Sequence, residues 1–248
     1  MSALNAVELL ALWDRAQAVP PTRRPLALLA PLTEIDGLGG LPVGVCDARL
    51  LRLRERLFGP QLEARVDCPQ CRESLEFTLP VGALCPAEPA EPGDPTGGLR
   101  CAHAGWSAEF HAPRYRDLEA VAEAPDPGAA REALLERCLE SLRAPDGSAR
   151  TLAEAPAELV AAVVAGMAAA DPAADLRVDL TCPSCQAGWT APLDPPAIVW
   201  AEIGWAASRL LREVHELAAA YGWSESGILT LTPARRQAYL DLVRAGTA

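Results

Sequence analysis

The sequence of 248 residues contains no lysine, and all 22 of its basic residues are arginines. Without lysine the chain cannot form a Schiff base with a substrate, hold a phosphate in a Walker-type loop or carry the lysine of a protein kinase. Histidine is scarce as well, and none of His103, His111 and His215 is spaced from a serine or cysteine as a catalytic triad requires. His215 and Glu216 begin a zinc-protease motif, but Ala219 stands where its second histidine belongs. We therefore expect a protein that is not an enzyme.

Basic residues are also few relative to acidic ones. The 33 acidic residues outnumber the arginines and give a formal net charge of −11. Nucleic-acid binding draws most of its affinity from cations placed against phosphates, so we expect no nucleic-acid partner. No apolar run reaches the ~18 residues of a membrane span, and the N-terminus carries acids where a signal peptide carries early cations. We expect no membrane partner and a cytoplasmic location.

Two Cys-Pro-x-Cys motifs are the most specific feature that the chain does have, and 110 residues separate them. The first places Cys68 beside Cys71, and the second places Cys182 beside Cys185. Two cysteines at this spacing direct their sulfurs towards one metal ion, and two such pairs supply the four tetrahedral ligands of a structural Zn²⁺ site. Redox-active or merely buried cysteines are the alternative, which a matched second pair disfavours. We predict that the four residues together bind one zinc per chain, with no open coordination position.

The residues on either side of each motif alternate between apolar and polar side chains. The alternating segments are 62–66 and 75–79 around the first motif, and 176–180 and 189–193 around the second. Such alternation predicts strands, so each motif should lie at the tip of an antiparallel hairpin. A further hairpin is expected over 99–111, with its turn at Ala104-Gly105, and should extend the same sheet.

Helical periodicity dominates the remainder of the chain. The fold class that follows is α+β: mainly helical, with a small antiparallel β module built on the two zinc-knuckle hairpins. The expected order is an N-terminal helical segment (1–44), the first knuckle and its β-hairpins (45–113), a helical insertion (114–174), the second knuckle hairpin in the same β module (175–193) and C-terminal helices (194–248). Proline, glutamate and glycine over 86–98 predict a mobile loop within the second of these segments.

Several helix boundaries carry specific features. The glycines at 37–44 predict a loop, after which Asp47 is placed to cap a helix that ends at Gly59. The longest helix should run over about 195–221, with Gly222 as its C-cap. Other helices are expected at about 3–18, 115–123, 128–142 and 156–169, with a short helix from 224 to 231 and a last one starting at 232–233. Cys138 lies among leucines and is interpreted as a buried thiol.

Tryptophan is concentrated near the C-terminus, where four of the six fall within the final 60 residues. Trp200 and Trp205 lie outside the narrow apolar stripe of the longest helix, and Trp223 follows its end. Exposed tryptophans often dominate the energy of a protein interface. We predict that these three residues form a partner surface; the alternative is that they fill the core against the hairpins.

Taken together, several segments resemble one family. They are the knuckles VDCPQC and LTCPSC, the helix entry APLDPPAIVWAEI and the tail AYGWSESGILTLTPARRQAYLDLV. They resemble the baseplate hub assembly chaperones of T-even-type contractile-tailed phages and of bacterial contractile injection systems. The likeness runs from about residue 45 to the C-terminus and is strongest after Cys182, whereas 1–44 depart from it. The resemblance implies a non-enzymatic assembly factor whose partners are hub or spike proteins of the baseplate.

Three other interpretations remain open at this point. The chain can be a permanent structural component of the baseplate, which would use the same surface but would remain in the finished particle. It can be a zinc-ribbon protein that binds nucleic acid or regulates transcription, which the cysteines favour and the charge opposes. The third is a metalloenzyme, which ranks last because four sulfur ligands leave no place for a water on the metal.

Overall fold

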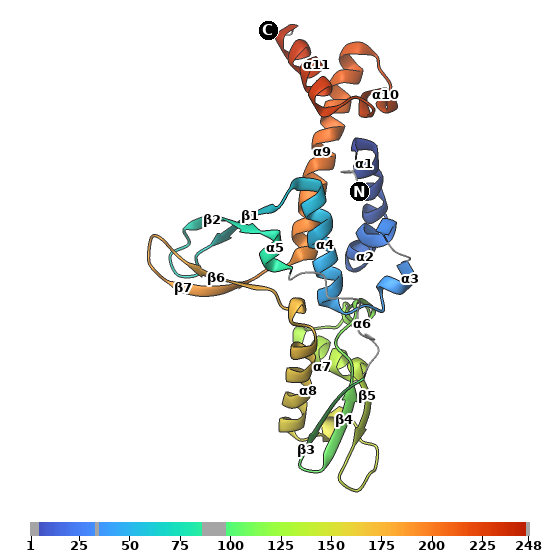
Figure 1. The fold of residues 1–248 in the computed structure, drawn as a ribbon, viewed down its shortest axis with the longest axis vertical. Helices are drawn as coiled ribbons and strands as arrows, with labels where there is room; N and C mark the ends of the chain where they lie inside the picture. The colour runs from blue at the N-terminus through green and yellow to red at the C-terminus, as the bar shows by residue number, and fades with distance from the viewer. Residues whose placement is uncertain (1–4, 33–34, 86–97, 247–248) are drawn as a thin grey trace. The chain divides into compact units, whose positions relative to one another are not determined.

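The computed structural model describes residues 5–32, 35–85 and 98–246. The chain divides into two compact units, one made of 1–28 together with 196–248 and the other of 29–195. Both are rich in helices, and the sheets are small and antiparallel, which confirms the α+β class (Figure 1). The loop expected at 86–98 lies outside the described residues except for Gly98.

The unit formed by 29–195 contains all seven strands of the described residues, arranged in three separate sheets of order β1-β2, β3-β4-β5 and β6-β7. Its strands are β1 (Gln61–Asp67), β2 (Ser74–Pro80), β3 (Leu99–His103), β4 (Trp106–Phe110), β5 (Leu139–Arg143), β6 (Arg177–Thr181) and β7 (Gly188–Pro192). Its helices are α3 (Ile35–Leu38), α4 (Val43–Phe58), α5 (Val81–Leu84), α6 (Tyr115–Val121), α7 (Pro127–Cys138) and α8 (Ala157–Ala170). Short 3-10 turns lie at Ala30–Leu32, Leu152–Glu154 and Pro172–Ala174.

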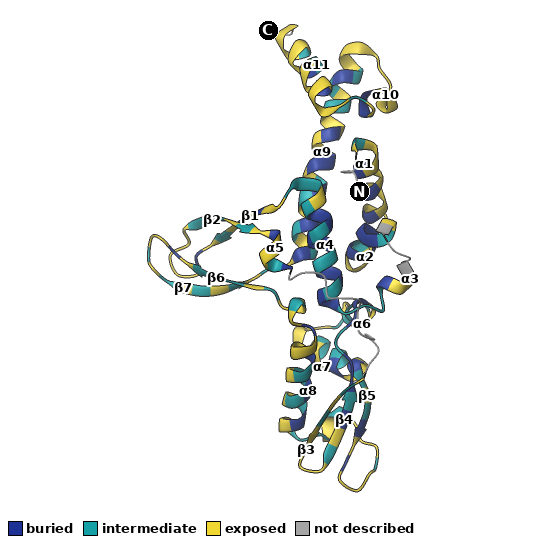
Figure 2. Cartoon of the chain, viewed as in Figure 1, coloured by how far each residue is buried: buried dark blue, intermediate teal, exposed yellow. Residues whose placement is uncertain are grey.

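Each cysteine motif connects the two strands of a hairpin, as the alternation predicts. In the first hairpin Leu62 lies opposite Leu79, and in the second Leu180 lies opposite Trp189. Along both hairpins, exposed residues, most of them polar, alternate with residues that are at least half-buried (Figure 2). The apolar face of each hairpin therefore lies on one side, which fixes the register of its strands.

The third hairpin does form, with its turn at Ala104-Gly105, but it does not extend the sheet of the first hairpin. It belongs to a separate three-stranded sheet, in which β4 pairs with β5. The helix expected to continue to 142 ends at Cys138, and the next residues form strand β5. Leucines spaced by three and four fit a helix, yet pairing with the open edge of β4 satisfies the backbone of Leu139–Arg143 instead. Helix α8 packs against this sheet, and Phe110, Leu159 and Cys138 lie at the centre of the core between them.

Helix α4 begins earlier than the sequence predicts, so Asp47 does not cap it. The helix starts at Val43, and its second residue, Gly44, donates its N–H to the buried carboxylate of Asp171 at 2.8 Å. Asp47 therefore lies inside the helix, where it is buried and accepts a 2.6 Å hydrogen bond from the Tyr115 hydroxyl. Burial, opposed by that hydrogen bond, raises the pKa of Asp47 to about 6. The C-terminal end agrees with the prediction, because Gly59 terminates the helix with a positive φ of 95°.

The raised pKa of Asp47 predicts a pH dependence of stability. A carboxyl whose pKa is about 6 when folded and 3.8 in its ordinary state binds its proton more tightly in the folded protein. Its contribution is therefore fully present below pH 3.8 and is lost as the pH rises through 6. Asp47→Asn keeps an acceptor for Tyr115 and removes this titration, so the variant should gain roughly 3 kcal/mol over the wild type as the pH rises from about 4 to about 7. Denaturant unfolding of both proteins across this range measures the difference between their free energies of unfolding. Any effect of acid on cysteine–metal bonds is the same in both proteins and cancels in this difference. A difference that does not change with pH would contradict the raised pKa of Asp47.

The other unit contains α1 (Ala6–Gln17), most of α2 (Arg24–Leu29) and of α9 (Pro195–Tyr221), α10 (Glu225–Leu229), α11 (Pro233–Gly246) and the 3-10 turn Pro21–Arg23. Asn5 and Glu8 form a capping box at the start of α1. Helix α9 ends as predicted, because Gly222 adopts a φ of 67°. Its last turns pack with α10 and α11 around a core of Leu217, Ile228 and Leu240.

Candidate metal centre

The four predicted cysteines come together where the tips of two hairpins meet. Cys68 and Cys71 lie in the turn between β1 and β2, and Cys182 and Cys185 lie in the turn between β6 and β7. The two hairpins lie side by side although 110 residues separate their motifs (Figure 1). The Sγ atoms of Cys68 and Cys185 are 3.7 Å apart, those of Cys71 and Cys182 are 3.6 Å apart, and all four sulfurs lie within 4.8 Å of one another.

The two turns share one backbone conformation. In the first, the N–H of Arg72 donates to the carbonyl oxygen of Cys68 at 3.0 Å, and in the second the N–H of Gln186 donates to that of Cys182 at 2.9 Å. Arg72 and Gln186, each directly after the second cysteine of its motif, have positive φ angles of 65° and 61°. The left-handed conformation is uncommon for residues other than glycine, so nothing in the residue type points to it. Its occurrence at both equivalent positions shows that the two motifs close their turns in the same way.

The spacing of the sulfurs fits a tetrahedral metal site. A metal–sulfur bond of about 2.3 Å and a tetrahedral angle place two sulfur ligands roughly 3.8 Å apart. The cross-hairpin distances of 3.6 and 3.7 Å are close to this value and far from the ~2.05 Å of a disulfide, and the chain's cysteines are free thiols. Cys68 and Cys182 are fully buried, whereas Cys71 is exposed. The cluster can hold one metal ion through four sulfurs.

The backbone around the first motif also favours the ligating form of its first cysteine. The N–H of Cys71 and, more weakly, that of Gln70 lower the pKa of Cys68 to about 7 by donating hydrogen bonds to its sulfur. The thiolate, rather than the thiol, is the form that binds a metal. Cys71 differs: a backbone hydrogen bond from Glu73 lowers its pKa, but desolvation and the neighbouring sulfurs of Cys185, Cys182 and Cys68 outweigh it and raise the pKa to about 12. Without a metal, Cys68 is therefore the cysteine of this hairpin that ionises first.

A second group of ligand types lies in the same unit, where His111, Asp117 and Cys138 are buried with their donor atoms within 4.8 Å of one another. Asp117 already accepts the N–H of Arg114 at 3.1 Å at the start of α6, and its other oxygen lies 3.5 Å from Arg137. Burial raises the pKa of Cys138 to about 12, so its thiol keeps its proton. Helix capping and core packing account for these three residues, and the prediction that Cys138 is a buried thiol is confirmed.

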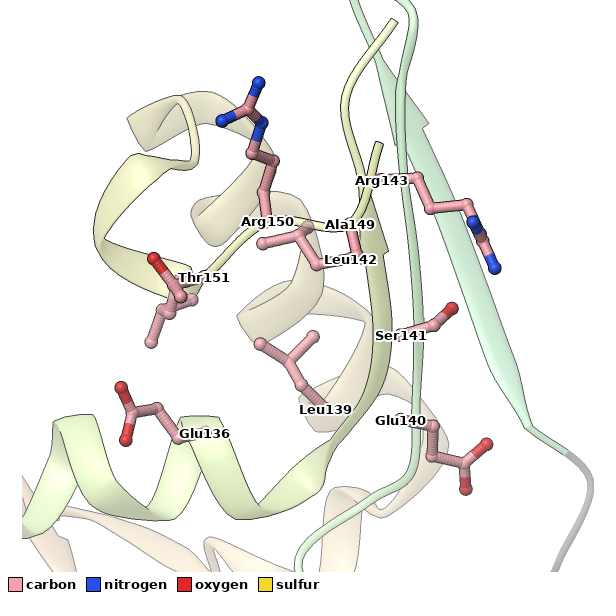
Figure 3. A pocket seen from close by; sticks show the side chains of 10 residues that line it. Glu136, Leu139, Glu140, Ser141, Leu142, Arg143, Ala149, Arg150 and Thr151 are labelled. Atoms are coloured by element: carbon pink, nitrogen blue, oxygen red, sulfur yellow. The ribbon is translucent and has the colours of Figure 1, made fainter. Parts of the chain in front are cut away.

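An open cavity of about 400 Å³ lies beside β5, and residues of that strand, of 149–152 and of the end of α7 line it. Figure 3 shows the guanidinium groups of Arg143 and Arg150 well apart, on opposite sides of the strand. Arg143 donates to the carbonyl of Gly147 at 3.2 Å, and Arg150 pairs with Glu154 at 3.1 Å. Both guanidinium groups are thus engaged in local contacts.

The three tryptophans predicted to form a partner surface have different surroundings. Trp205 projects from the middle of α9 with 73% of its surface exposed. Trp200 is half-buried, and the guanidinium of Arg24 lies 4.8 Å from the centre of its ring. Trp223 is 37% exposed and stacks on Tyr221, with 4.7 Å between the ring centres. Trp205 is therefore the one of the three that offers most of its side chain to a partner.

No helix within the described residues is both long enough and apolar enough to cross a membrane. No protein-family model matches the chain, and neither a curated protein nor a solved structure matches it significantly. The features that point to a function are the cysteine cluster, the surface around Trp205 and the segments that carry the family resemblance.

Proposed function

We propose that the chain is a non-enzymatic, cytoplasmic assembly factor that binds hub or spike proteins of a contractile-tail baseplate, with one structural Zn²⁺ held by the four clustered cysteines. The resemblance of the knuckles, the α9 entry and the C-terminal tail to baseplate hub assembly chaperones supports the baseplate part of this proposal. The exposure of Trp205 supports the binding part most directly. A large aromatic side chain left 73% exposed on a helix is the kind of residue that anchors an interface.

Zinc is the metal that this ligand set favours. Four thiolates in tetrahedral spacing are typical of structural zinc, whereas calcium and magnesium prefer oxygen ligands. With four sulfurs on the ion no coordination position is left for water, so the metal would support the fold without taking part in a reaction. Thiol ligands persist in a reducing compartment, which is the reason for proposing a cytoplasmic location.

The distribution of charge argues against a nucleic-acid partner. Residues 29–195, which include the cysteine cluster, contain 26 acidic residues and 14 arginines. Four thiolates on a divalent ion would add two further negative charges to this unit. Phosphates would be repelled from the part of the chain that otherwise looks most like a zinc-ribbon module.

The proposal predicts that Trp205→Ala weakens binding to the partner without unfolding the protein. In co-expression with the hub and spike proteins of the contractile system from the same genome, the wild type should co-purify with one of them. Trp205→Ala should cost roughly 2 kcal/mol or more in affinity, because an exposed anchor gives its energy to the interface. Its free energy of unfolding should change by less than about 0.5 kcal/mol, since surface substitutions away from special features have small effects. Trp200→Ala, which removes a half-buried ring beneath Arg24, is the matched control and should lower stability instead.

Two results would count against this function. If no hub or spike protein is retained by the wild type, the baseplate proposal fails. If Trp205→Ala binds as tightly as the wild type, the interface lies elsewhere on the chain. Mass spectrometry of purified particles then distinguishes the two roles, because an assembly chaperone is absent from the finished particle and a permanent component is present at fixed stoichiometry.

A further inference from the structure

The exposed face of α9 points to the chemistry of the partner. We infer that this face binds an acidic amphipathic segment of another protein, with Trp205 as the apolar anchor and with Arg209 and Arg212 as the charged contacts. The inference rests on the proposed function, because it describes the partner of the same surface. The inference also specifies an acidic partner, whereas the overall negative charge of the chain would by itself favour a basic one.

Helical spacing places the three side chains on one face. Arg209 and Arg212 follow Trp205 by four and seven residues, so they lie one and two turns further along the same side of the helix. All three are exposed, and 71% of the Arg209 side chain is accessible. Small residues at Ala201 and Ser208 flank the tryptophan on this face and are also exposed. A partner can therefore reach the indole ring without displacing a bulky neighbour.

Two acids close to this face, on the following turns of α9, are held by arginines of α11. Glu213 accepts a 2.9 Å hydrogen bond from the buried Arg236, and lies 3.8 Å from Arg209. Glu216 is bound by both nitrogens of the Arg244 fork at 3.0 Å. Arg212 forms no ion pair within the described part of the chain. Glu213 and Glu216 are thus neutralised from the side of α11. Glu202, one turn before Trp205, is half-buried and takes part in an interaction of its own, so the exposed charges next to Trp205 are those of Arg209 and Arg212.

Local charge outweighs the total charge at an interface of this kind. The unit of 1–28 and 196–248 has seven acidic residues and eight arginines, so nearly all of the chain's excess acid belongs to residues 29–195. At physiological salt the Debye length is about 8 Å, so charges far from the interface affect binding much less than charges in contact with the partner. The contacts at Trp205 therefore select a partner that carries carboxylates around an apolar position.

The test uses the full-length protein and three fluorescently labelled synthetic peptides. Each is an amphipathic helix of about four turns with leucines along one face, and the flanking positions are all Glu, all Gln or all Lys. By fluorescence anisotropy at about 50 mM NaCl, the wild type should bind the Glu peptide roughly tenfold more tightly than the Lys peptide, and added salt should reduce the preference.

Arg209→Glu combined with Arg212→Glu should reverse the preference, and Trp205→Ala should weaken binding of the Glu peptide about thirtyfold. Arg15→Glu with Arg235→Glu changes the net charge equally, on exposed positions of α1 and α11, and should leave the preference in place.

Several outcomes would overturn the inference. One is equal binding of the Glu and Gln peptides, and another is a control pair that acts as strongly as the Arg209 and Arg212 pair. Sedimentation that shows a dimer lost in Trp205→Ala would identify the occupant as a second copy of this chain. Tight binding of a single-stranded DNA oligonucleotide that depends on Arg212 would identify it as nucleic acid. If the peptides fail while a hub protein is still retained through Trp205, only the acidic chemistry is wrong; if the peptides behave as expected and no hub protein is retained, only the baseplate assignment is wrong.

Discussion

Replacing Cys182 by serine should release the metal and lower the free energy of unfolding by roughly 5 kcal/mol or more, because the free energy of binding a structural metal is part of the free energy of folding. At this size of protein the loss corresponds to a fall of about 10–20 °C in melting temperature. The effect should be large because the ion would be shared by the two hairpins. Cys182 is fully buried at the tip of one hairpin, and its sulfur faces that of Cys71 on the other at 3.6 Å. Without the ion, the two hairpins, whose motifs are 110 residues apart, would lose the link between their tips.

Elemental analysis and thermal unfolding together check this prediction. Protein purified without chelator should contain one zinc per chain, and Cys182→Ser should contain none. Cys101→Ser is the matched control, because Cys101 is a half-buried cysteine outside the cluster and its loss should cost less than about 1 kcal/mol. An unchanged melting temperature for Cys182→Ser would contradict a structural role for the cluster. Two zincs per chain in the wild type would contradict a site shared between the hairpins.

The hairpins and the four-cysteine cluster were predictable because both depend on local, periodic patterns. Alternation with a period of two fixes which side chains of a strand are buried, and Cys-Pro-x-Cys fixes which sulfurs lie together. Two matched motifs then imply that distant segments meet. The left-handed conformation of Arg72 and Gln186 was not predictable in this way. The turn imposes it on residues whose own preference is for negative φ, so residue type gives no indication.

Strand β5 and the start of α4 show where local patterns fail. The leucines at 135, 139 and 142 fit the period of a helix, but Leu139–Arg143 pairs with β4, and a partner strand is not visible in a local pattern. Asp47 has the spacing of a helix cap, yet the helix start is fixed by Asp171, which is 127 residues from Gly44 in the sequence. In both cases a contact with a distant segment overrides the local preference.

The tryptophans illustrate a further limit of sequence reasoning. Helical periodicity placed Trp200 and Trp205 outside the main apolar stripe, which is compatible with either a partner surface or a second buried face. The structure separates them, because Arg24 from another helix covers the ring of Trp200 whereas Trp205 is left exposed. Which aromatic side chain is covered depends on how α2 packs against α9. That packing is not encoded in the period of α9 itself.

Gly44→Ala should destabilise the protein by roughly 3 kcal/mol, although the position is helical and alanine is the better helix former. A methyl group at Gly44 would overlap the carboxylate of Asp171 and would lie only 2.6 Å from the backbone atoms Ala173 C and Ala174 N. Backbone atoms cannot move aside as a flexible side chain does, so the start of α4 would have to separate from the 3-10 turn Pro172–Ala174. That separation would also lengthen the 2.8 Å hydrogen bond from the Gly44 N–H to Asp171, which is buried and has few alternatives.

A second glycine distinguishes this steric effect from a general effect of glycine replacement. Gly204 lies inside α9, and an added methyl group there would have no atom within 4 Å. Gly204→Ala should therefore be neutral or should stabilise by up to about 1 kcal/mol, through helix propensity alone. Denaturant unfolding of the two variants should give shifts of opposite sign. A Gly44→Ala variant as stable as Gly204→Ala would show that α4 is not held by the contact with Asp171, and the helix start would then have to be set by Pro42 and the residues that follow it.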